Sequence, residues 1–189
     1  VALHREVSLG TPGYRRLGLE VRRSQGRIRP ASAPADHLSA ATGWEAWLTR
    51  IQFYILKPGS RDNRFGLACR VTEIAYRRGH RVLIHTESAE QAQHLDRLLW
   101  TFREQSFLPH GQIADADASL TPVLIDHQGN AGDEHDVLVN LTTTVPGFFS
   151  RFERVLECID HEPEIKAAGR QRFRYYRDHG YPLENAEID

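Results

Sequence analysis

The sequence predicts an α/β fold, with three α/β/α layers built around a mostly parallel, Rossmann-like sheet. Short apolar runs alternate along the chain with longer segments in which apolar residues recur every three or four positions, a pattern typical of strands that alternate with helices. The later runs are apolar at successive positions, so we expect both faces of the sheet to be covered. With 189 residues, of which 40% are hydrophobic, the chain can bury one such core.

The first strand and helix are expected directly after residue 50. Residues 51–56 are mainly β-branched, aromatic or aliphatic, and the next four residues, Lys-Pro-Gly-Ser, are typical of a turn. Residues 63–78 then carry apolar side chains at helical spacing. Gly79 is expected to end this helix, because a glycine just beyond the last turn accepts a left-handed backbone conformation.

The same order repeats after Gly79. Residues 81–85 predict a second strand, and Ser88 is expected to cap a helix over residues 89–102. Three further apolar runs predict strands, and a last helix over residues 164–177 is expected to close the domain. These three strands are expected at residues 122–125, 137–141 and 154–159.

The N-terminal region differs from the rest of the chain. Residues 1–47 contain Gly- and Pro-rich stretches and no sustained period of 2 or 3.6, so we expect an extension that is disordered, or one that reflects a start assigned too early. The absence of methionine from the sequence motivates the second alternative. Residues 48–189 are expected to form the single α/β domain.

Charge also divides the chain. Residues 1–50 carry eight Arg and no Lys against four acidic residues, whereas residues 51–189 carry sixteen basic and twenty-one acidic residues. Proteins that coat DNA usually have a dominant positive field, because binding is driven by the release of counterions from phosphates. The acidic balance of the main domain argues against that function.

The cysteines and the hydropathy pattern indicate a cytoplasmic protein. Cys69 and Cys158 lie inside apolar segments, where thiols are usually buried and reduced. No apolar run approaches the roughly 20 residues that a membrane-spanning helix needs, and the N-terminus lacks the hydrophobic core of a signal peptide.

Motifs for catalysis are not found. The segment after the first strand lacks the glycine-rich turn of a dinucleotide site, and there is no Walker loop. The acidic clusters at residues 133–136 and 160–162 follow or precede expected strands, where such residues usually form turns and caps. We therefore predict no catalytic, cofactor-binding or metal-binding residue and no intrinsic catalysis. A nucleotide-dependent α/β enzyme remains the alternative suggested by the fold class.

The last helix carries an unusual stripe. At 3.6 residues per turn, Lys166, Arg170, Phe173 or Arg174, and Arg177 fall on one face. Such a stripe suits an acidic, partly apolar partner. Two alternatives remain open from the stripe alone: a solvated basic face and direct binding of single-stranded nucleic acid.

Large aromatic rings cluster where the second helix ends. Trp100 and Phe102 lie in its last turn, and Phe107 follows a polar loop. Rings that stay partly exposed often anchor interfaces, although core packing is the commoner role.

Short segments spaced along the chain resemble one known family in the same order. From Thr49 to about Leu183 the chain is similar to the chi subunit of bacterial DNA polymerase III holoenzyme. The matching segments are RIQFY at 50–54, RGHRVLI at 78–84, LDRLLW at 95–100, SFLPH at 106–110, DVLVNL at 136–141 and RQRFRYYRDHGY at 170–181.

The resemblance implies a non-enzymatic adaptor of the replisome. Chi pairs with the psi subunit, which tethers it to the clamp loader, and binds the acidic C-terminal tail of single-stranded DNA-binding protein; contact with DNA is therefore indirect. By this resemblance Lys166 and Arg170 would bind the acidic groups of the tail, and Ile159 and Phe173 its apolar end. Phe173 stands where the best-known member has a tyrosine. Tyr176 and Arg177 are expected at the edge of the pocket.

A second surface follows from the same resemblance. Trp100 and Phe107 match an aromatic pair that the family uses on its psi-facing side. In some bacteria an iron–sulfur helicase also uses that surface. We expect the two surfaces to be separate, as a bridging subunit requires.

Overall fold

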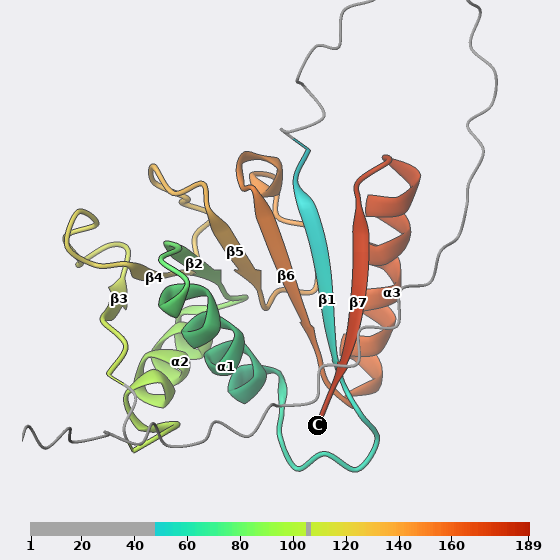
Figure 1. The fold of residues 1–189 in the computed structure, drawn as a ribbon, viewed down its shortest axis with the longest axis horizontal. Coiled ribbons are helices and arrows are strands. Elements are labelled where there is room, and N and C mark those ends of the chain that lie inside the picture. Colours follow the sequence, from blue (N-terminus) through green and yellow to red (C-terminus); the bar gives the residue numbers. More distant parts are fainter. Residues whose placement is uncertain (1–47, 105–106) are drawn as a thin grey trace, which may run out of the picture.

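The computed structural model describes residues 48–104 and 107–189, and the expected extension over residues 1–47 lies outside this part of the chain. Seven strands form one sheet in the order β3-β4-β2-β5-β6-β1-β7 (Figure 1). Every strand pair in it is parallel. The predicted fold class is therefore confirmed, and the sheet is more uniform than the mostly parallel one expected.

The predicted elements are present with bounds close to those expected. They are β1 (Arg50–Leu56), α1 (Arg64–Arg77), β2 (Val82–His85), α2 (Ala89–Thr101), β4 (Val123–Asp126), β5 (Val137–Asn140), β6 (Arg154–Ile159) and α3 (Pro163–Asp178).

Both expected helix boundaries around β2 are confirmed. Gly79 has a φ of 84°, its N–H donates to Tyr76 O, and the next N–H, of His80, donates to Ala75 O, which together form a Schellman motif. The Ser88 hydroxyl accepts from the Gln91 N–H at the start of α2.

Three short elements were not predicted, and the expectation that the last helix closes the domain is wrong. A 3-10 helix, η2 (Phe149–Arg151), precedes β6, and two strands, β3 (His110–Gln112) and β7 (Leu183–Ile188), form the edges of the sheet. β7 has the sequence LENAEI, which lacks an apolar run. It is a strand because it pairs with β1 over six residues.

The helices cover the two faces of the sheet unequally (Figure 1). α1 and α2 pack on one face, in a core that includes Leu67, Leu95 and Ile84. α3 packs on the other, in a core that includes Ile165, Tyr176 and Phe152. Successive residues of β1 and β6 point to opposite faces, so each strand contributes to both cores.

Candidate functional site

α3 places the predicted cationic stripe beside its buried face. Ile165, Gly169, Arg172 and Tyr176 are buried and recur every three or four residues, which makes one side of the helix. Lys166 and Phe173 are half-buried, and Arg170 is exposed. At 100° per residue these three side chains lie together on one flank of that buried side.

The flank lies beside β1. The Phe173 ring meets the Phe53 ring edge-on, with centroids 5.4 Å apart. Arg172, on the buried side of α3, reaches away from this flank to the carbonyl oxygen of Thr143 beyond β5 at 3.0 Å. The predicted stripe therefore faces the β1–β7 side of the molecule.

Gly169 brings α3 close to β6. A Cβ atom at this position would lie 2.7 Å from Ile159 Cδ1, a distance that real Cβ contacts do not reach. Gly169 is one turn from Lys166 and one turn from Phe173, so the Ile159 side chain lies below the middle of the predicted pocket. Ile159 itself is buried, and it supports the pocket floor more than it forms a surface.

A buried polar network fixes the orientation of α3. Glu157, in the centre of β6, pairs with Arg172, whose Nη2 lies 2.8 Å from Glu157 Oε2. Tyr176 Oη donates to Glu157 Oε1 at 2.8 Å, and Asn140 Nδ2 donates to the same oxygen at 3.1 Å. Each buried polar group in the network thus has a partner, as burial requires.

This network corrects the expected position of Tyr176. Its side chain is fully buried, so it lies beneath α3 and not at the edge of the pocket. Burial is the main cause that raises the pKa of Tyr176, and the nearby Glu157 carboxylate adds to it. The phenol stays protonated and serves as a hydrogen-bond donor.

The cations of the flank differ in their pairing. Arg177 Nη2 lies 2.8 Å from Asp178 Oδ1, with both side chains exposed. Within residues 48–104 and 107–189, no ion pair involves Lys166 or Arg170. Their charges are therefore available to an anionic ligand, whereas the charge of Arg177 is partly neutralised.

The predicted aromatic pair lies on the other helical layer, near the end of α2. Trp100 is 53% exposed and Phe107 is 73% exposed. The two rings meet edge-on with centroids 5.8 Å apart, and the His110 ring lies 4.8 Å from Trp100. Phe102 instead packs partly against the core. Two large rings are thus presented to solvent as one apolar surface.

At the point where an α/β sheet usually binds nucleotides, side chains of this chain cap the backbone amides. β1 and β6 are neighbours, and the helices that follow them leave on opposite faces, so the crevice lies at their carboxyl ends. There Asn63 Oδ1 accepts from the N–H groups of Phe65 and Gly66, and Asp160 Oδ2 accepts from that of Arg64. The amides that would hold a phosphate are already bonded.

The acidic clusters have structural roles, as the sequence suggested. Glu134 pairs with Arg81 at 2.6 Å, and this contact raises the pKa of Arg81. Asp136 accepts from the Arg81 N–H, and Asp160 accepts from the Glu162 N–H. In the described part of the chain, no group of three or more His, Cys, Asp or Glu side chains is placed to hold a metal ion.

Comparison with known proteins identifies the family of this chain. Residues 48–184 match the family described as DNA polymerase III chi subunit, HolC. The chain belongs to the chi subunit family. It is thus an accessory subunit of DNA polymerase III that acts in DNA replication, and the names of its relatives indicate no catalytic activity.

Three chi relatives support the assignment. The DNA polymerase III subunit chi of Pseudomonas aeruginosa is 40% identical over 141 residues, which cover 75% of this chain and 98% of the relative. The chi subunit of Haemophilus influenzae is 29% identical over 72% of this chain and 96% of its own length. The chi subunit of Escherichia coli is 32% identical over 64% of this chain and 82% of its own length. No helix that the structure describes has the length and hydropathy to cross a bilayer.

The sequence reasoning missed the residues that hold α3 in place. Glu157 interrupts the apolar run of β6, and Arg172 interrupts the apolar side of α3. A charged residue in each of two apolar stripes was the available signal, because such residues are rarely buried unless they are paired.

Proposed function

We propose that this chi-family chain links the clamp loader, through psi, to the acidic C-terminal tail of single-stranded DNA-binding protein. The observation that supports the proposal best is the flank of α3, where Lys166 and Arg170 lie beside the half-buried Phe173 ring. Neither cation has an ion-pair partner in the described part of the chain. A tail that carries aspartates, a terminal phenylalanine and a free carboxylate requires this combination of cations and apolar surface.

The pocket residues have distinct roles in this proposal. Lys166 and Arg170 bind the carboxylates, and Phe173 packs against the terminal ring of the tail. Ile159 supports the floor from below Gly169. Arg177 contributes less, because Asp178 competes for its guanidinium.

The proposed psi-facing surface is the exposed pair Trp100 and Phe107, which an iron–sulfur helicase would share. α2 and α3 pack on opposite faces of the sheet (Figure 1). Both partners would therefore bind at the same time, and DNA would be contacted only through the binding protein.

The test is a pull-down of the full chain with single-stranded DNA-binding protein, either intact or lacking its last few residues. We expect capture of the intact protein only. Lys166→Glu or Arg170→Ala should abolish capture and leave psi binding unchanged, whereas Trp100→Ala should do the reverse. All three side chains are exposed or half-buried, so circular dichroism should show an intact fold. Loss of both partners in one folded variant would contradict the division.

A further inference from the structure

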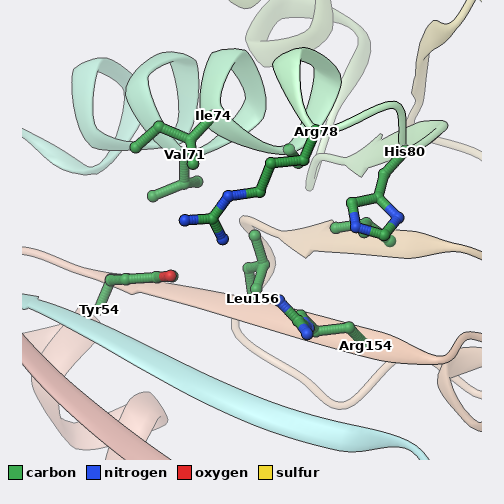
Figure 2. Close-up of a pocket in the computed structure, with 9 residues that line it drawn as sticks. Tyr54, Val71, Ile74, Arg78, His80, Arg154 and Leu156 are labelled. Carbon is green, nitrogen blue, oxygen red and sulfur yellow. The ribbon is translucent and has the colours of Figure 1, made fainter.

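A second cationic and apolar surface lies on the face of the sheet opposite α3. It is a groove between α1 and the sheet, at the side where α1 borders β6 and β1 (Figure 2). It is lined by Tyr54 and Leu156 from the two strands and by Ile74 from α1. Ile74 is 40% exposed, which is high for an aliphatic side chain in a helix that packs on a sheet.

Two arginines and a histidine also line this groove. Arg78 and His80 come from the end of α1 and the turn after it, and Arg154 comes from the first position of β6. Figure 2 shows the Arg78 guanidinium extending from α1 toward Tyr54, with Arg154 on the strand across from it. Burial is the main cause that raises the pKa of Tyr54, and the charges of Arg154 and Arg78 oppose it.

These cations lack compensation within the described residues. No acidic side chain lines the groove, and no ion pair involves Arg78 or Arg154. Arg154 is also the register partner of Arg50 on β1. Like charges placed side by side on a sheet are destabilising, so an anion bound here would relieve a repulsion.

We propose that this groove binds an extended acidic peptide segment of a partner protein, with an acidic side chain over Arg78 and an apolar side chain two residues away over Ile74. Ile74 and Arg78 are four residues apart on α1, which is about 6 Å along a helix. Alternate side chains of an extended peptide are about 6.6 Å apart, so the two spacings match.

A nucleic acid is the less favoured occupant. Single strands bind through bases that stack on aromatic rings, whereas Ile74, Val71 and Leu156 give this groove a mainly aliphatic lining. This inference does not depend on the proposed tail pocket, because the two surfaces share no residue.

The experiment measures fluorescence anisotropy of a labelled peptide, Glu-Asp-Glu-Ser-Leu-Ser with an amidated end, titrated at low salt with the full chain. The double variant R78A/R154A should raise the Kd at least about tenfold, since it removes two charge-assisted contacts. I74S should raise it about threefold, as should replacing the leucine of the peptide with serine. The double variant K166A/R170A should change the Kd less than about twofold.

Each other outcome overturns the proposal. An unchanged Kd in R78A/R154A would exclude the groove, and equal loss in K166A/R170A would place the peptide in the α3 pocket. Tight binding of an oligothymidylate, lost in R78A/R154A while the peptide binds weakly, would assign the groove to nucleic acid. Arg78 is exposed and Arg154 half-buried, so circular dichroism should show both groove variants folded.

Discussion

Glu157 on β6 and Arg172 on α3 form an ion pair of 2.8 Å in the interior, where their side chains are 0% and 3% exposed. An ion pair at this depth loses the hydration of both charges, and its stability depends on the additional hydrogen bonds around it. Tyr176 and Asn140 supply these bonds to Glu157. The pair fixes how α3 is rotated on the sheet, and therefore which side of α3 carries the exposed cations.

Removing Arg172 should destabilise the fold strongly. Arg172→Leu leaves the Glu157 carboxylate buried without its cation, which costs about 3 to 5 kcal/mol. Tyr176→Phe removes one donor to the same carboxylate and should cost about 1.5 to 3 kcal/mol. Urea unfolding measures both values, and a Tyr176→Phe variant less stable than Arg172→Leu would contradict this order.

The close approach of Gly169 to Ile159 should be visible in a double-mutant cycle. Gly169→Ala places a methyl group 2.7 Å from Ile159 Cδ1 and should cost about 1 to 3 kcal/mol, because a packed site accepts extra volume poorly. Ile159→Val removes that terminal methyl and costs about 0.5 to 1.5 kcal/mol alone. The double variant should therefore be more stable than the sum of the single changes predicts. Additive losses in urea unfolding would show that the two side chains do not meet.

Asp126 should contribute stability that disappears in acid. Burial by itself would raise the pKa of Asp126, but hydrogen bonds with His85 and from the amides of Gln128 and Gly129 lower it overall. The folded pKa lies below the unfolded value of about 3.9, so the contribution is present above that pH and is lost as the pH falls through the folded pKa. Asp126→Asn should lose about 1 to 3 kcal/mol at neutral pH. The difference in unfolding free energy between Asp126→Asn and the parent chain should become smaller below about pH 4. A difference in unfolding free energy that is constant across this range would be inconsistent with the role assigned to the carboxylate.

Salt should weaken tail binding at the α3 flank. Lys166 and Arg170 are partly or fully exposed, and charges at such positions are screened over about 10 Å at 0.1 M salt. Calorimetry with the tail peptide should show an affinity that falls as the salt concentration rises. This dependence on salt should be weaker in Arg170→Ala and unchanged in Trp100→Ala. An affinity independent of salt would mean that apolar contacts alone hold the tail.

The sequence predicted the elements whose formation depends on their own composition. β2, β4, β5 and β6 are apolar runs, and α1 and α2 have apolar periodicity with Ser88 and Gly79 at their boundaries. β7 was not predictable in this way, because Leu183–Ile188 contains two glutamates and an asparagine. Its strand conformation comes from pairing with β1, which lies more than 120 positions earlier in the chain. β3, with three residues, depends in the same way on β4.

For the candidate site, the sequence pattern predicted only which residues share one face of the last helix. The period of 3.6 places Lys166, Arg170 and Phe173 on one flank, and that arrangement is present. The expectation that Tyr176 lies at the pocket edge came from the family resemblance, and it is wrong. The burial of Tyr176 is set by Glu157, which lies on another element. The groove beside Arg78 is lined by residues of α1, β1, β5 and β6, and no pattern within one of these elements indicates it.

β7 also limits the pairing of this sheet with strands of other chains. Without residues 183–188, the strongly apolar β1 would become the outer strand, with a free row of N–H and C=O groups that pairs readily with other chains. β7 takes that outer position with Glu184, Asn185 and Glu187 exposed, and charged side chains on an edge strand oppose further pairing. The strand that lacks an apolar run thus protects this edge of the sheet against aggregation.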